Sequence, residues 1–237
     1  MTKLLYITGD SFSFGEELDQ ERTFTEYKKQ NCYARYICDQ FDIPDYINSS
    51  MPAGSNERSY RHIITDVSRL LEQYKPDDLF VTVSLSHCNR REFYRADNKQ
   101  YYAFMANQSP PNFPILKGFG DYKLWNVLTQ YYYEDYGYFM HDCLMVLGIQ
   151  NFLKTTRVPY LLTMSMMDAK ENQLLIDNIP PEIRNQFDST RYLIQPSFLQ
   201  YTLDKGYQVG KNFHPLEDAH REWGLFLSRI IRINNLL

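Results

Sequence analysis

The sequence lacks the features that mark membrane-spanning, secreted and nucleic-acid-binding chains. Its longest apolar run is Cys143–Leu147, far below the roughly 20 apolar residues that a transmembrane helix needs. The N-terminus leads directly into a strand-like segment, without the apolar stretch and cleavage site of a signal peptide. The formal net charge is −4 and no Lys/Arg-rich run occurs, so we expect no nucleic-acid partner and no membrane partner. These absences predict a cytoplasmic or otherwise intracellular protein.

Cysteine is also scarce, and its four residues show no metal-like pairing with the five histidines. Cys32 and Cys38 lie six residues apart in a predicted helix, whereas Cys88 and Cys143 stand alone. We therefore expect four reduced thiols that mainly pack in the core, and no metal site.

What the sequence does contain is an alternation of short apolar runs and amphipathic segments. The apolar runs predict strands at Lys3–Thr8, Asp45–Asn48, Leu79–Val83 and Tyr160–Met164. Apolar residues at helical spacing predict helices over about 26–41, 56–74 and 121–155, and a last one from Pro215 onward. This alternation is typical of an α/β fold with a central parallel sheet and helices on both faces.

No internal repeat or low-complexity linker divides the chain, so residues 1–237 are expected to form one domain. Residues 94–120 interrupt the pattern with prolines and aromatic side chains, and we expect an insertion or lid there. The aromatic residues between Tyr94 and Tyr138 either line a carbohydrate or acyl pocket or pack within a helix and this lid. Residues 168–212 predict loops with short elements.

Two loops after predicted strands carry unusual chemistry. In parallel sheets ligands bind beyond the carboxyl ends of the strands, so the loops after Thr8, Asn48 and Val83 should surround one site. The first loop, Gly9–Gly15, presents the Ser11 hydroxyl. The second places Gly54 at a helix start, where an unobstructed N–H can meet a developing oxyanion. Alone, each is more often a simple turn or helix cap.

A third element is His214, which lies directly before Pro215 and the last predicted helix. Proline suits the first helical turn and fixes the preceding residue, so His214 is well placed as a base. His220 lies within the helix, where we expect it to make a structural hydrogen bond.

Together, GDS after the first strand, PxGSN after the second and HP before the last helix resemble the SGNH/GDSL hydrolase family. The resemblance implies a flavodoxin-like three-layer α/β/α sandwich. It also implies hydrolysis of a small-molecule or glycan ester, often an O-acetyl group, through an acyl-enzyme and without a cofactor. Ser11 would be the nucleophile and His214 the general base, with the backbone N–H groups of Ser11 and Gly54 as oxyanion donors.

The sequence departs from the family at two positions. Lys211 stands where the family has an aspartate three residues before its histidine, so a backbone carbonyl or another carboxylate, such as Asp204, would have to orient His214. If none does, Lys211→Asp is expected to raise the rate. In place of the family's third motif, Gly-x-Asn-Asp, the chain offers Ser86 at the asparagine position, with Asn89 as a further candidate oxyanion donor.

Two other interpretations remain. These departures suit a catalytically impaired SGNH-fold module that binds a glycan or a protein. Alternatively, Gly9–Gly15 is a phosphate-binding loop, although it lacks the Lys-Ser/Thr ending and the GxGxxG spacing of known nucleotide sites. The charged segment Arg90–Glu92 is expected to be a solvated or salt-bridged turn.

Overall fold

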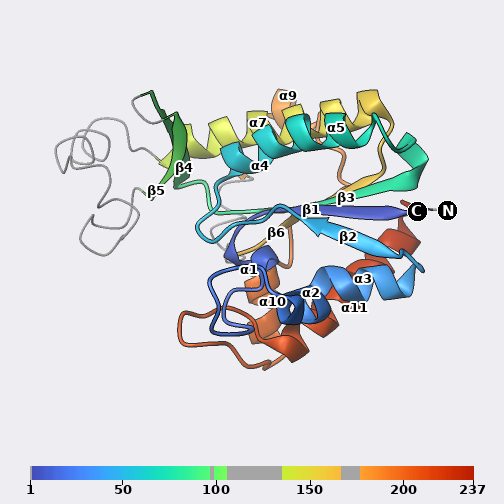
Figure 1. The fold of residues 1–237 in the computed structure, drawn as a ribbon. Helices are drawn as coiled ribbons and strands as arrows, with labels where there is room; N and C mark the ends of the chain where they lie inside the picture. Colours follow the sequence, from blue (N-terminus) through green and yellow to red (C-terminus); the bar gives the residue numbers. More distant parts are fainter. Residues whose placement is uncertain (1, 97–98, 106–134, 167–176) are drawn as a thin grey trace.

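The computed structural model describes residues 2–96, 99–105, 135–166 and 177–237 (Figure 1). Five parallel strands form one sheet in the order β2-β1-β3-β6-β7. The strands are β1 Leu4–Thr8, β2 Asp45–Asn48, β3 Leu79–Leu85, β6 Tyr160–Met164 and β7 Tyr192–Leu193. This is the doubly wound, flavodoxin-like strand order, and it confirms the predicted fold class.

The central strands are buried on both faces, as parallel strands require. Every residue of β1, β3 and β6 is buried, and side chains alternate between two core clusters. Leu5 and Ile7 of β1 join one cluster, whereas Leu4 and Tyr6 join the other. Because successive side chains of a strand point to opposite faces of the sheet, each apolar run packs against both helical layers.

The helices form a layer on each face of the sheet (Figure 1). One layer contains α4 Asn56–His62, the π-helical segment η1 Ile63–Val67, α5 Ser68–Leu70, α7 Asp135–Thr156 and α9 Pro181–Arg184. The other contains α1 Ser11–Phe14, α2 Glu26–Asn31, α3 Tyr33–Gln40, α10 Phe198–Asp204 and α11 Glu217–Ile233. A short 3-10 turn, η2 Pro76–Asp78, leads into β3.

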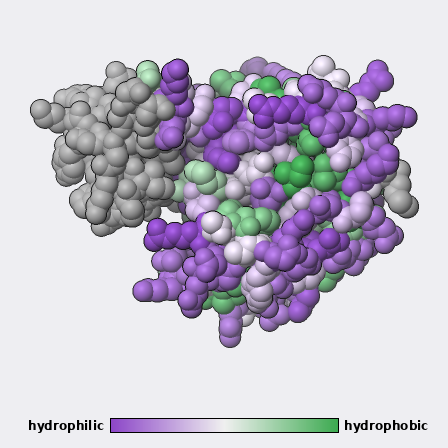
Figure 2. All heavy atoms as spheres, in the orientation of Figure 1, coloured by the Kyte–Doolittle hydropathy of each residue, from purple (hydrophilic) through white to green (hydrophobic). Residues whose placement is uncertain are grey.

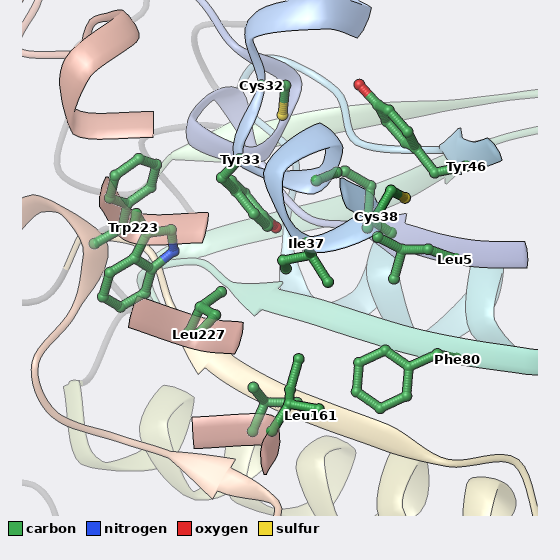
Figure 3. Packing of buried hydrophobic residues seen from close by; sticks show 14 of the residues in the cluster. Leu5, Cys32, Tyr33, Ile37, Cys38, Tyr46, Phe80, Leu161, Trp223 and Leu227 are labelled. Atoms are coloured by element: carbon green, nitrogen blue, oxygen red, sulfur yellow. The ribbon is translucent and has the colours of Figure 1, made fainter. Parts of the chain in front are cut away.

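The larger core cluster lies between the sheet and the α3–α11 pair (Figure 3). Trp223 of α11 is fully buried and stacks on Phe198 of α10, with ring centroids 5.1 Å apart. Gly224 allows α11 to approach α3 closely, because a Cβ there would lie 2.6 Å from the Tyr33 carbonyl oxygen. All four cysteines are buried and free, which confirms that they pack as thiols.

Most helices and strands lie where the sequence pattern predicts them, and the differences concern a helix break and a short strand. The strands at Asp45–Asn48 and Tyr160–Met164 are confirmed to the residue. The predicted helix over 26–41 is two helices, because Cys32 adopts an extended conformation between α2 and α3. Strand β7 lies within 168–212, where only short elements were expected.

The predicted insertion begins as a hairpin outside the main sheet. Strands β4 Arg90–Arg95 and β5 Gln100–Met105 pair antiparallel and form a separate two-stranded sheet. The turn predicted at Arg90–Glu92 is therefore wrong, because these residues begin β4. The salt bridges considered for this segment are present, since all three residues form ion pairs. The rest of the predicted lid, and the predicted helix before Asp135, lie outside the described residues.

The surface is largely hydrophilic on the face shown in Figure 2, where hydrophobic side chains occupy only small areas. Within the part of the chain that the structure describes, no helix is both long and apolar enough to cross a membrane.

We expect Gly224→Ala to destabilise the protein, because its new methyl group would clash with the Tyr33 carbonyl and force α11 away from α3. The expected loss is about 1–3 kcal/mol of unfolding free energy, measured by denaturant titration. Ile233→Ala is the control on the same helix, because Ile233 is 78% exposed and should change stability by less than about 0.5 kcal/mol. Equal effects of both substitutions would contradict this account of the helix contact.

Candidate functional site

The loops that follow β1, β2 and β3 meet at the carboxyl edge of the sheet, as predicted. Met51 N–H donates to the Gly9 carbonyl at 3.2 Å. Cβ atoms added to Gly9 and Gly54 would lie 2.7 Å from the Ser84 and Gly9 carbonyl oxygens, respectively. Only glycine allows this approach, so the two glycines of the motifs bring the first loop against both strand β3 and the second loop.

The buried carboxylate of Asp10 joins these loops to two more elements. Its Oδ1 accepts from Phe12 N–H at 3.0 Å and so caps α1. Its Oδ2 accepts from the hydroxyls of Ser86 at 3.0 Å and Ser165 at 2.6 Å. Arg90 Nη1 lies 3.1 Å from the same oxygen, and both side chains of this ion pair are almost fully buried. A buried carboxylate needs such partners to remain charged.

Ser11 is the first residue of α1 and is 4% exposed. The Asp10 cap and the left-handed Gly15, with a φ of 77°, bound this single turn of helix. The Ser11 N–H is one of the first-turn amides, which have no partner within their own helix. The Asp10 cap and Gly15 therefore fix the position of the Ser11 hydroxyl and of the Ser11 N–H. These are the two groups to which the resemblance assigns catalytic roles.

The His214 imidazole is held by a carboxylate that the sequence analysis did not identify. Its Nδ1 lies 2.9 Å from Glu17 Oε2. Glu17 also accepts from Asn212 N–H at 2.9 Å and from the Asn212 side-chain amide at 3.1 Å. Desolvation raises the pKa of Glu17, but the hydrogen bonds from His214 and Asn212 outweigh it and hold that pKa below its usual value.

Glu17 thus makes the contact with His214 that was considered for Asp204. In the structure Asp204 accepts instead from the Gln200 amide on α10. No local motif signalled Glu17, because it is 197 residues from His214. The one sequence signal is that a carboxylate follows Gly15 within the same loop as Ser11.

The imidazole also lies beside the nucleophile loop. The rings of Phe12 and His214 are 5.3 Å apart between centroids, so His214 packs against the residue that follows Ser11. No direct hydrogen bond joins Ser11 to His214, both of which the structure describes. The contact that places His214 beside the turn of Ser11 is therefore the ring packing against Phe12.

The backbone is strained at the three motifs. Glu17, Ala53 and Phe213 are not glycines, yet they have φ values of 66°, 60° and 63°. Such left-handed conformations cost roughly 1–3 kcal/mol each and cluster at functional sites. Here Ala53 and Phe213 directly precede Gly54 and His214, and Glu17 contacts His214. Left-handed residues also occur away from the motifs, at Asp42, Lys99, Arg157 and Asn235.

The other candidate oxyanion donors have partners of their own. The Gly54 N–H donates to the Met51 carbonyl at 2.9 Å, so an oxyanion would have to share this donor. The Ser86 hydroxyl donates to Asp10, and its N–H donates to Asn56 Oδ1 at 2.7 Å. Asn89 is 3% exposed, and its N–H lies 3.1 Å from His87 Nδ1.

His220 makes the structural hydrogen bond that was predicted. Its Nδ1 accepts from the Tyr33 N–H at 3.2 Å. Complete burial lowers the pKa of His220 to about 3, and nearby His214 contributes to this shift. His220 is therefore neutral at physiological pH and supports the packing of α11 against α3.

These strands, loops and glycines define the α/β fold of the SGNH hydrolases. The sequence model of the family of unknown function DUF6071 matches residues 13–227, and the chain belongs to this family. A comparison with curated protein sequences gives no match.

Solved structures of similar fold include several esterases. A protein described as lipolytic and of the G-D-S-L family, from Desulfitobacterium hafniense DCB-2, is 11% identical, with 97% of this chain and 99% of that chain covered and a TM-score of 0.50. The structure named TesA is 12% identical over 98% and 99% of the chains, with a TM-score of 0.51. A catalytic mutant of Axe2, an acetylxylan esterase from Geobacillus stearothermophilus, is 12% identical over 99% and 95%, also at 0.51. At such identities the likeness establishes the fold alone.

We expect Asp10→Asn to lower the unfolding free energy by about 3–5 kcal/mol, because it leaves the buried Arg90 guanidinium without its carboxylate. Arg90→Met and the double variant complete a thermodynamic cycle, measured by denaturant unfolding. A favourable coupling energy between the two sites is expected. Strictly additive effects would show that the ion pair does not hold the loops together.

Proposed function

We propose that this chain is a serine esterase or deacylase that acts through an acyl-enzyme. Ser11 is its nucleophile, His214 its general base and Glu17 the carboxylate that orients the base. The observation that carries this proposal is the 2.9 Å contact between Glu17 Oε2 and His214 Nδ1. Glu17 would thus supply the orienting carboxylate that the SGNH hydrolases carry three residues before the histidine, where this chain has Lys211.

The proposed roles follow from the position of each proton. An Nδ1–H donated to Glu17 leaves Nε2 of His214 with a free lone pair, which accepts the Ser11 proton as Oγ attacks the ester carbon. The imidazolium that forms is stabilised by the neighbouring carboxylate. The alcohol then leaves with this proton. Water, deprotonated by His214, attacks the acyl-enzyme, and the acid product leaves Ser11 restored.

The oxyanion would be stabilised first by the Ser11 N–H, with Gly54 as a shared donor. Asn89 is the remaining side-chain candidate, because the Ser86 hydroxyl is committed to Asp10. A small-molecule or glycan ester is the proposed substrate class, since one of the similar folds belongs to an acetylxylan esterase.

One observation favours a second function, that of a non-catalytic binding module. Two of the candidate oxyanion donors, Gly54 N–H and the Ser86 hydroxyl, already donate to protein acceptors. An oxyanion hole reduced in this way would support binding of an ester or glycan better than its turnover.

Covalent labelling separates the two functions. We expect a fluorophosphonate probe to modify the wild type at Ser11 and to leave Ser11→Ala and His214→Ala unmodified, because the hydroxyl needs a base. Ser13→Ala is the matched control, since Ser13 lies in the same helical turn but hydrogen-bonds Tyr33. Intact-mass spectrometry and peptide mapping give the readout. Labelling that survives in Ser11→Ala would move the nucleophile, and a wild type that is folded but inert would favour the binding module.

The role of Glu17 is tested by kinetics. Glu17→Gln should lower kcat/KM on p-nitrophenyl acetate by about 10²–10⁴-fold, as loss of the orienting carboxylate does in serine proteases. Glu21→Gln is the control, because Glu21 is exposed in the following part of the loop. Since Glu17 already bonds His214, Lys211→Asp should no longer raise the rate. A large gain from Lys211→Asp, with no loss in Glu17→Gln, would assign the orienting role elsewhere.

A further inference from the structure

A cavity lies where the carboxyl ends of β3 and β6 meet helix α7. Leu85 and Ser86 line it at the end of β3, Met164 at the end of β6, and Phe139 and Val146 on α7. Its volume is about 30 Å³, which is room for roughly two water-sized groups. Most of its wall is apolar, as is typical of pockets that bind small organic groups.

Asp142 of α7 is the one acidic side chain among the described residues of this wall, where Asn56 and Ser86 are also polar. It is 6% exposed, and its Oδ2 accepts from the side-chain amide of Asn56. Its Oδ1 is buried and has no hydrogen-bond partner among the described residues. An unpaired polar atom in an apolar cavity destabilises a fold, so this oxygen is available for a ligand.

Two residues connect this cavity to the catalytic loops. Ser86 lines it and donates its hydroxyl to Asp10, which directly precedes Ser11. Asn56 also lines it and follows Gly54 by two residues on the oxyanion loop. The cavity and the loops of Ser11 and Gly54 therefore have Ser86 and Asn56 as common neighbours.

The carboxyl group of Asp142 is neutral at pH 7. Burial raises its pKa to about 8, although the Asn56 hydrogen bond and the charge of Arg91 oppose this. Arg91 is itself paired with Glu57 at 2.6 Å, and Glu57 raises the Asp142 pKa further. The other titratable groups on the cavity wall are Cys88, Cys143 and Tyr192, and burial raises the pKa of the last two. A neutral carboxyl donates a hydrogen bond, whereas a carboxylate only accepts.

We propose that this cavity receives the acyl group of the ester, and that Asp142 selects short acyl groups that carry an acceptor oxygen. This proposal rests on the proposed function, because Ser11 defines where the acyl carbon lies. The cavity admits two or three non-hydrogen atoms beyond the carbonyl, and the protonated Oδ1 of Asp142 donates to an ether or carbonyl oxygen among them.

The test compares ethyl methoxyacetate with ethyl butyrate, which differ by one ether oxygen in place of a methylene. Each variant's ratio of kcat/KM for the two esters is measured in competition at pH 7. Asp142→Leu should lower the ratio by about tenfold, the effect of one hydrogen bond. Asp142→Asn is the matched control, since its carbonyl can accept from Asn56 while its amide donates into the cavity, so its ratio should stay near that of the wild type.

The pH dependence gives a second test that needs no substitution. As Asp142 ionises above pH 8, its donor is lost, so the wild-type ratio should fall between pH 7 and pH 9. The ratio of Asp142→Asn should be the same at both pH values. Ratios that are equal in all three proteins and at both pH values would overturn the proposal and leave the cavity to ordered water.

A binding measurement separates failure of this proposal from failure of the esterase function. In Ser11→Ala, which cannot form an acyl-enzyme, NMR titration should give a lower Kd for ethyl methoxyacetate than for ethyl butyrate. Adding Asp142→Leu should remove that difference. Absence of turnover in the wild type refutes the esterase, whereas equal Kd values in Ser11→Ala refute the role of Asp142.

Discussion

The arrangement of the site depends on one buried carboxylate. Asp10 accepts hydrogen bonds from the ends of β3 and β6 and from β4, while its other oxygen caps the helical turn that carries Ser11. Without these donors its charge could not remain in the core, and without its charge Arg90 would lack a partner. The position of Ser11 is thus fixed by the same carboxylate that joins the hairpin to the sheet.

Ser86, which stands where the SGNH motif has an asparagine, takes part in the same constraint. A serine hydroxyl has a single proton, and here that proton is given to Asp10. The position thereby contributes to the anchoring of the nucleophile loop. The Asn56 side chain makes two hydrogen bonds with the backbone of Ser86 and donates a third to Asp142 on α7. Polar groups near the site thus connect both helical layers to the strand ends.

The sequence predicted the features that local pattern determines. Buried strands such as Tyr160–Met164 are continuous apolar runs, and the strand ends carry the GDS and PxGSN motifs, so both the sheet and the meeting of its loops could be foreseen. Strand β7 was missed because two residues carry no periodicity. Glu17 was missed for a different reason. Its partnership with His214 depends on how the loop after α1 folds against residues 210–214, which no local pattern encodes.

The place of Glu17 changes how the site comes together. In the family's usual pattern the acid and the base are three residues apart, so one loop carries both of them. Here the carboxylate that contacts His214 follows the helical turn of Ser11, and it lies 197 residues before the histidine. If the segment around His214 separates from the rest of the fold, the histidine loses its contacts with Glu17 and with the ring of Phe12 at the same moment. The contact between Glu17 and His214 therefore forms only when the two distant segments meet, and a partly folded chain lacks it.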